Sequence, residues 1–147
     1  MESGKGARNL IGTPSMNITG LNHITLAVAD LDRAMTFYRD LLGARCRAHW
    51  PTGAYLELGP IWLCLEKTRM VHPRADDTHI ALTCADFDAA CARLRPHVTE
   101  WKVNRSEGAS LYFLDPDGHK LELHAGDLAS RLAHYRAQPN SPVTLLD

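Results

Sequence analysis

The sequence lacks any apolar run approaching the ~20 residues that a membrane-spanning helix requires. Residues 1–15 mix Gly, Ser, Lys, Arg and Pro and lack the apolar stretch of a secretory signal, so we expect a disordered leader over residues 1–16. An excess of basic charge is also missing. The formal net charge is -1, which excludes a general attraction to nucleic acid and leaves only local anion sites. These absences favour a soluble, cytoplasmic protein.

Cysteine is scarce, and its spacing shows no C-x-x-C motif. The four cysteines, at positions 46, 64, 84 and 91, lie mostly in apolar runs. This pattern indicates reduced, buried thiols, and we expect no structural disulfide. The chain has 147 residues, of which 45% are apolar and 22% charged, and this is enough for one well-filled core or two small packed modules.

An internal repeat is the most informative feature that the sequence does contain. Residues 22–34 (NHITLAVADLDRA) return as residues 78–90 (THIALTCADFDAA). In both copies a histidine opens an apolar, strand-like run, and an Ala-Asp-x-Asp pair then begins a helical pattern with an N-capping aspartate. Two related modules bring His23 and His79 to equivalent places, which favours a shared metal centre over two independently packed histidines.

Strand, helix and turn signals around the repeat predict an α+β fold made of two βαβββ modules. Residues 17–67 form the first module, residues 68–77 a polar linker, residues 78–126 the second module, and residues 127–147 a closing helix and tail. The predicted helices run from Asp30 to about Leu42 and over residues 86–94 and 127–137. The predicted strands cover residues 21–28, 44–50, 54–58, 61–66, 78–84, 99–103, 110–114 and 120–124.

A carboxylate on the last strand of the second module can complete a metal site. If the modules are related by a pseudo-two-fold axis, Glu122 approaches the two histidines, and two histidines with one carboxylate leave the open positions of a catalytic metal. Glu66 is a rival carboxylate that could also make a four-ligand site, because positions 66 and 122 differ by 56, as do positions 23 and 79. A solvated role for Glu122 on an edge strand is the alternative, and His124 is expected to support the site without binding the metal.

The segment from residue 101 to residue 112 (WKVNRSEGASLY) is dense in hydrogen-bonding groups. Lys102 and Arg105 offer charge, several residues offer hydroxyls, and Gly108 allows close backbone approach to a ligand. Arg131, on the closing helix, can add a bidentate fork suited to a phosphonate, phosphate or carboxylate. An ordinary surface loop is the alternative interpretation of this segment.

Five segments together resemble the fosfomycin-resistance glutathione transferases of the FosA type, in the vicinal oxygen chelate superfamily. They are LNHITLAVADL (residues 21–31), GAYLELG (53–59), WLCL (62–65), NRSEG (104–108) and YFLDPDGH (112–119). The resemblance extends from about Met16 to the C-terminus. It implies paired βαβββ modules of a vicinal oxygen chelate (glyoxalase-like) fold, assembled as a domain-swapped homodimer.

The resemblance also implies the ligands of two metal ions. Manganese is expected to bind His23 of one chain together with His79 and Glu122 of the other. A potassium ion beside the substrate is expected to bind a loop that contains Asn104, Ser106, Gly108 and Ser110.

Substrate-binding and catalytic residues follow from the same resemblance. The residues expected to hold the phosphonate are Lys102, Ser106, Tyr112 and Arg131. Trp62 and Cys64 are expected in the pocket wall. The expected catalytic residues are Thr25 near the epoxide oxygen, Tyr55 near the glutathione thiol, and Arg131.

The implied activity is metal-dependent addition of glutathione to the epoxide of fosfomycin, which inactivates the antibiotic. Alternatives on the same fold are a glyoxalase-like isomerase, an iron-dependent dioxygenase, a transferase that uses another thiol, and a protein that only sequesters its ligand. A fosfomycin hydrolase is disfavoured, because Gly53 stands near the place where such hydrolases carry a glutamate base. Asp77 and Ile80 stand where aromatic residues are expected in the closest relatives, which is expected to alter the pocket rim or dimer contacts.

Overall fold

The computed structural model describes residues 16–147, so the predicted leader lies outside the described residues except for Met16. The first module contains one four-stranded sheet with the strand order β1-β4-β3-β2. Strand β1 runs parallel to β4, and the other neighbours are antiparallel. Its elements are β1 (His23–Val28), α1 (Leu31–Met35), the π-helix η1 (Thr36–Leu41), β2 (Arg45–Trp50), β3 (Gly53–Leu58) and β4 (Ile61–Lys67).

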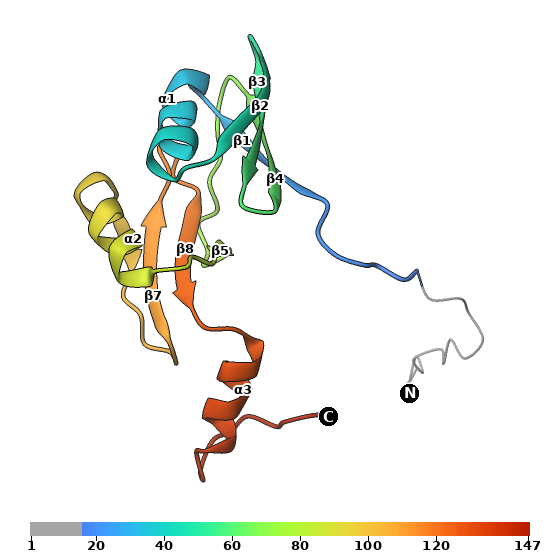
Figure 1. The fold of residues 1–147 in the computed structure, drawn as a ribbon, viewed down its shortest axis with the longest axis vertical. Helices are drawn as coiled ribbons and strands as arrows, with labels where there is room; N and C mark the ends of the chain where they lie inside the picture. Colours follow the sequence, from blue (N-terminus) through green and yellow to red (C-terminus); the bar gives the residue numbers. More distant parts are fainter. Residues whose placement is uncertain (1–15) are drawn as a thin grey trace, which may run out of the picture.

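The second module repeats this arrangement with the strand order β5-β8-β7-β6 and a parallel β5–β8 pair. Its elements are β5 (Ile80–Leu82), α2 (Phe87–Leu94), the 3-10 helix η2 (Arg95–His97), β6 (Glu100–Lys102), β7 (Ala109–Leu114) and β8 (Lys120–Ala125). A last helix, α3 (Leu128–Arg136), extends from the end of β8 away from both modules (Figure 1). The predicted pair of βαβββ modules is therefore confirmed.

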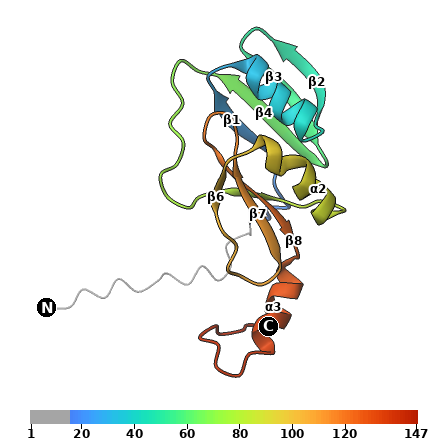
Figure 2. The same cartoon turned by 90° about the vertical axis from the view of Figure 1, so that its left-hand side faces the viewer.

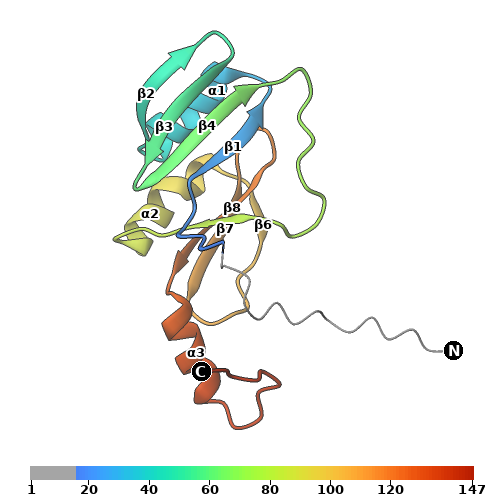
Figure 3. The ribbon, with the colours of Figure 1, turned by 90° about the vertical axis from the view of Figure 1, so that its right-hand side faces the viewer.

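One face of the first sheet is covered by a helix and the other is open. Helix α1 lies against the face that Figure 2 shows, whereas no helix of residues 16–147 covers the face seen from the opposite side in Figure 3. Alternation along the strands explains the difference. Leu26 and Val28 of β1 point to the core and are buried, while His23 and Thr25 lie on the other face and are exposed.

The helix predicted from Asp30 to Leu42 forms, but not as one regular α-helix. Asp30 caps it as expected, since its side chain accepts a hydrogen bond from the Arg33 main-chain N–H. From Thr36 onward it widens into a π-helix, with Leu42 N–H donating to the Phe37 carbonyl at 3.0 Å. The wider turn lets Phe37 and Tyr38 both enter the core, with ring centroids 4.9 Å apart.

The strand predicted over residues 78–84 is shorter in the structure, because local hydrogen bonds replace ladder bonds at its start. The Asp76 carboxylate accepts from Thr78 N–H at 3.0 Å, and the His79 ring is 2.7 Å from the Asp77 carbonyl. Strand β5 therefore begins only at Ile80. His79 precedes its strand, whereas His23 opens β1.

The two modules share one continuous hydrophobic core, and the Asp-Pro-Asp-Gly turn joins them by polar contacts. The Tyr38 hydroxyl donates to buried Asp115 at 2.6 Å, and Asp117 accepts from the Ala29 main-chain N–H and from Arg33, each at 3.0 Å. Burial raises the pKa of Asp115, and burial beside that carboxylate raises the pKa of Tyr38. None of the helices within residues 16–147 has the length and apolarity needed to cross a bilayer.

Candidate active site

His79 and Glu122 form a corner of the second sheet that has the donor set of a metal site. His79 Nε2 lies 3.8 Å from Glu122 Oε1, and His79 Nδ1 lies 2.7 Å from the Asp77 carbonyl. Because a carbonyl only accepts, Nδ1 carries the hydrogen and Nε2 presents its lone pair beside the carboxylate. This tautomer is the one that a metal-binding imidazole needs.

Burial of Glu122 gives independent evidence that a cation fits this corner. The residue is 6% exposed, and its Oε2 atom has no hydrogen-bond partner among residues 16–147. A buried acceptor without a partner is costly, and a bound cation removes that cost. Glu122 is on β8, which lies inside its sheet between β5 and β7. The alternative of a solvated Glu122 on an edge strand is therefore wrong.

His23 offers a similar imidazole on the other module. Its Nδ1 atom is 2.6 Å from Asn22 Oδ1, and its ring lies 4.7 Å from that of Trp62. Within residues 16–147, however, no three His, Cys, Asp or Glu side chains form a cluster able to hold a metal. A single chain thus brings together two of the three predicted ligands and leaves His23 apart from them.

The other two residues considered as metal ligands or supporting groups, Glu66 and His124, have different surroundings. Glu66, the rival ligand, lies exposed near the end of β4, in register with Ala27. His124 is half-buried on β8, and its Nδ1 atom is 2.7 Å from Ser110 Oγ. His124 therefore contacts Ser110 through its ring, which is consistent with the supporting role expected for it.

Lys102 and Tyr112 continue the face that carries Glu122. Lys102 of β6 is in register with Tyr112 of β7, which is in register with Glu122 of β8. Lys102 Nζ lies 5.3 Å from the centre of the Tyr112 ring and 3.5 Å from Asp77 Oδ2. A cation, a phenol and a carboxylate thus stand side by side across three strands, as required to bind an anion next to a metal.

The predicted potassium loop is closed by the side chain of Asn104. Its Nδ2 atom donates to the carbonyls of Gly108 at 2.8 Å and Ser106 at 3.4 Å, and its Oδ1 atom accepts from Ser106 N–H at 3.1 Å. Gly108 has φ +81°, and a Cβ atom there would lie 2.7 Å from the Ala125 carbonyl. Only glycine fits this close turn, so the loop holds several oxygen atoms in a small space.

Arg131 joins the same loop from α3. The helix starts with a capping box between Asp127 and Ser130, which fixes the first turn that carries Arg131. Arg131 Nε donates to Glu107 Oε2 at 3.0 Å, and its Nη2 atom is 3.4 Å from Ser106 Oγ. The bond to Glu107 raises the pKa of Arg131.

Sequence reasoning missed the contact between Arg131 and Glu107. The sequence feature that could have indicated this contact is Glu107, the single acidic residue in the basic and polar stretch from residue 101 to residue 112. The predicted meeting of Ser106 and Arg131 does occur, although Glu107 takes part in it.

The open face of the first sheet carries the remaining predicted residues. Thr25 is in register with Cys64, and Cys64 with Tyr55, so the three side chains lie next to each other across β1, β4 and β3. The Tyr55 ring contacts the rings of Trp62 and Trp50 at 5.3 and 4.8 Å between centroids. Both tryptophans and Tyr55 are about two-fifths exposed, which is unusual for such large rings.

Trp50, which sequence reasoning also missed, covers Gly53. A Cβ atom at Gly53 would lie 2.5 Å from Trp50 Cζ2 and 2.9 Å from the Leu65 carbonyl. A larger side chain at this position therefore cannot be accommodated unless Trp50 moves. The space beside Gly53 is filled by the Trp50 indole.

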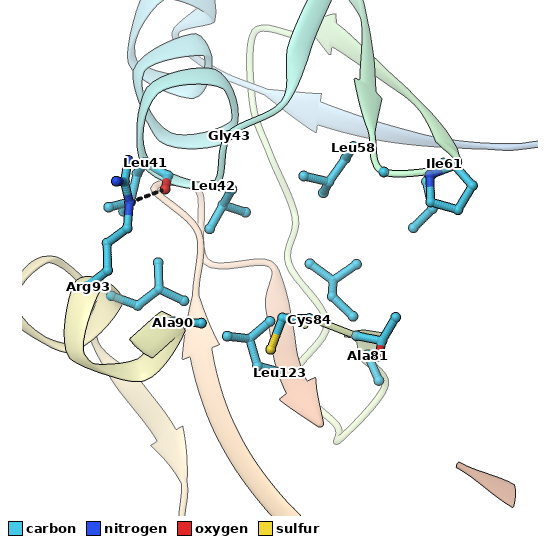
Figure 4. Close-up of a pocket in the computed structure, with 15 residues that line it drawn as sticks. Leu41, Leu42, Gly43, Leu58, Ile61, Ala81, Cys84, Ala90, Arg93 and Leu123 are labelled. Carbon is cyan, nitrogen blue, oxygen red and sulfur yellow. Dashed lines mark hydrogen bonds between the residues drawn. The ribbon is translucent and has the colours of Figure 1, made fainter. Parts of the chain in front are cut away.

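An apolar cavity of about 580 Å³ is lined by other residues. It opens between Leu42 and Leu58 of the first module and Cys84 and Ala90 of the second (Figure 4). None of the predicted site residues lines it. The predicted site residues lie instead on one face of each sheet: the second sheet carries the Glu122 corner and the anion-binding groups, and the first carries His23, hydroxyls and aromatic rings.

Comparison with known proteins shows which family the chain resembles. The Glyoxalase/Bleomycin resistance protein/Dioxygenase superfamily matches residues 20–123. The chain is 54% identical over 129 residues to Glutathione transferase FosA from Serratia marcescens, covering 83% of this chain and 92% of that protein. It is 41% identical over 136 residues to Metallothiol transferase FosB from Staphylococcus epidermidis, covering 84% and 96%.

A solved structure of a variant of the fosfomycin resistance protein FosX from Listeria monocytogenes has a TM-score of 0.72 and 31% identity to this chain. The match covers 80% of this chain and 98% of that one, and the FosX variant is in complex with Mn(II) and 1S,2S-dihydroxypropylphosphonic acid. The predicted glyoxalase-like fold is therefore confirmed. On these likenesses and its own geometry, the chain belongs to the fosfomycin-resistance enzymes of the Glyoxalase/Bleomycin resistance protein/Dioxygenase superfamily.

Proposed function

We propose that the protein is a metal-dependent glutathione transferase that opens the epoxide of fosfomycin. The observation that carries the proposal is the row of Lys102, Tyr112 and Glu122 across three adjacent strands, with His79 beside the carboxylate. This row offers a cation-binding corner next to an anion-binding one, which matches a substrate with an epoxide oxygen close to a phosphonate. The 54% identity to a glutathione transferase supports the choice of thiol.

His79, Glu122 and His23 are the residues that would hold a divalent cation, and such an ion, when bound, supplies Lewis acidity at the epoxide oxygen. Lys102 and Arg131 neutralise the phosphonate, which reduces its repulsion of an incoming thiolate. The sulfur forms a bond to a ring carbon as the carbon–oxygen bond breaks, and the thiol proton ends on the new alkoxide oxygen. We assign Thr25 to donate to that oxygen and Tyr55 to assist thiol ionisation.

We further propose that the complete site is shared between two copies of the chain. Within residues 16–147 of one chain, His23 does not join His79 and Glu122, and β1 and β5 are edge strands that each pair with a single neighbour. A second copy can bring its His23 to the Glu122 corner by placing these two edges together. The oxygen-rich loop around Asn104 and Gly108, with Ser106 and Ser110, is proposed to hold potassium beside the phosphonate.

Sharing of the site can be tested by complementation. His23→Ala and Glu122→Ala variants are each expected to be inactive, yet a heterodimer of the two retains one intact site. After equal mixing and subunit exchange, about a quarter of the wild-type activity is expected, because half of the dimers are mixed and each has one of two sites. Absence of any recovered activity, with exchange verified by mass spectrometry of the intact dimers, contradicts the sharing.

The proposed reaction can be tested by incubating the protein with fosfomycin, manganese and glutathione and analysing the products by mass spectrometry. A thioether adduct supports the proposal, and replacing potassium with sodium is expected to slow its formation. Bacillithiol and cysteine should be compared directly, since the chain is also 41% identical to a metallothiol transferase. A diol as the main product, or activity only on a hemithioacetal or a catechol, contradicts the proposal. Binding without turnover identifies a sequestering protein.

A further inference from the structure

Asp77 lies where the metal corner meets the anion-binding groups. Its main-chain carbonyl is 2.7 Å from His79 Nδ1, and its carboxylate oxygen Oδ2 is 3.5 Å from Lys102 Nζ. The side chains of Asp77 and Lys102 are 72% and 42% exposed, so this ion pair faces solvent at the rim. Asp77 therefore contacts both parts of the proposed site, but through different atoms.

The two proposed phosphonate-binding cations are held by carboxylates in different ways. Arg131 is paired with Glu107 in a part-buried contact, with side-chain exposures of 30% and 18%. Lys102 is paired with Asp77 in a contact that is open to water on both sides. Among the ion pairs of residues 16–147, Asp77 is the only carboxylate partner of Lys102. An incoming anion therefore meets a Lys102 ammonium group that is already paired with Asp77.

We propose that Asp77 is an affinity-determining residue that holds Lys102 and competes with the phosphonate for it. The proposal rests on the proposed function of Lys102 in binding a phosphonate. A dianion that reaches Lys102 meets a like charge a few ångströms away, so it must share the ammonium group or displace the Asp77 carboxylate. Asp77 consequently weakens binding of the doubly charged substrate and leaves the chemical step unchanged.

The size of the effect is set by solvent exposure. Exposed ion pairs are weak, so removing the competing carboxylate is expected to improve phosphonate affinity about two- to fivefold. Asp77→Asn is the informative variant, because it removes the charge and keeps the main-chain carbonyl that orients His79. Lower KM for fosfomycin, with unchanged kcat and unchanged KM for glutathione, is the expected kinetic pattern.

Asp76→Asn is a matched control one residue away. The Asp76 carboxylate pairs with Arg74 at 2.6 Å and accepts from Thr78 N–H, and an asparagine retains an acceptor for that bond. This variant removes the same charge without touching Lys102. It is expected to leave the KM for fosfomycin at the wild-type value, so an equal improvement in both variants overturns the proposal.

A double-mutant cycle tests whether Asp77 acts through Lys102. Asp77→Asn is expected to have no effect on fosfomycin affinity in a Lys102→Met background, since nothing remains to compete for. An undiminished gain in that background means direct repulsion of the substrate and overturns the competition.

Binding without thiol separates this inference from the proposed reaction. The manganese-loaded wild-type and variant proteins are titrated calorimetrically with methylphosphonate, which cannot be turned over. Tighter binding by Asp77→Asn alone supports the inference even if the wild-type protein forms no glutathione adduct, a result that contradicts only the proposed reaction. Equal affinity of wild type and Asp77→Asn, or no binding by either, overturns the role of Asp77.

Discussion

Replacing Glu122 with glutamine is expected to stabilise the metal-free protein while removing its response to manganese. The carboxylate is 6% exposed and its Oε2 atom has no hydrogen-bond partner among the described residues. A buried unpaired acceptor costs about 1–3 kcal/mol, and more when it is charged. Neutralising it is therefore expected to raise the free energy of unfolding by about 2 kcal/mol, or ~4–8 °C in Tm for a chain of this size.

Addition of manganese should make the wild-type protein more stable than Glu122→Gln, which reverses the order of stability expected without metal. A ligand that binds only the folded state at 100 times its Kd adds about 2.7 kcal/mol, and this gain is expected for wild type and lost in Glu122→Gln. Thermal unfolding followed by circular dichroism, at one fixed protein concentration with and without manganese, measures both effects. The readout does not depend on catalysis.

Glu66→Gln serves as the matched control for Glu122→Gln. Glu66 lies on β4, the counterpart of β8 in the first module, but it is exposed. Its replacement is expected to change stability by less than about 0.5 kcal/mol and to leave the manganese response intact. The reasoning is refuted if metal-free Glu122→Gln is no more stable than wild type, or if manganese stabilises it as strongly.

Three further perturbations test the fold around the site. Tyr38→Phe leaves the buried Asp115 carboxylate without its 2.6 Å donor and is expected to cost about 1–3 kcal/mol in urea unfolding; an unchanged midpoint contradicts a role for this bond. Burial raises the pKa of Asp115 above 3.8, so its contribution to stability is full below that pH and is lost as the pH rises through the raised value. Asp115→Asn should flatten this part of the stability profile, and an unaltered slope contradicts the assignment. Gly108→Ala is expected to weaken activation by potassium and cost about 1 kcal/mol or more, because its φ of +81° and the Ala125 carbonyl exclude a Cβ atom; a normal potassium response argues against the loop.

Helix caps and strands could be predicted from the sequence because both depend on residues that are neighbours in the chain. Asp30, Asp86 and Asp127 each cap the helix that follows, and the two modules have the same strand order. The π-helical turn at Thr36–Leu41 could not be predicted from local sequence, and it carries Tyr38, which bonds to Asp115, 77 positions away. The late start of β5 at Ile80 likewise depends on which local bonds Thr78 and His79 form.

Site residues divide in the same way. Residue types and spacing were enough to nominate His79, Glu122 and Lys102, which the structure brings to one face. They gave no indication that Trp50 covers Gly53 or that Glu107 holds Arg131, because these contacts join segments with unrelated local patterns. The pairing of Asp77 with Lys102 has the same origin, since the predicted linker ends beside a strand from the far side of the sheet.

The internal repeat already indicated that two βαβββ modules are present and that each carries a histidine at the equivalent position of the repeat, because hydrophobic periodicity and capping are local properties of the chain. Tertiary packing alone decided that, among residues 16–147, the buried Glu122 has a carboxylate oxygen without a hydrogen-bond partner and that His23 stands apart from it within one chain. Burial and convergence depend on how distant strands are stacked, and no local pattern encodes that distance. The repeat provides His23 and His79 at equivalent positions, and the fold gives them different neighbours, since only His79 lies beside Glu122.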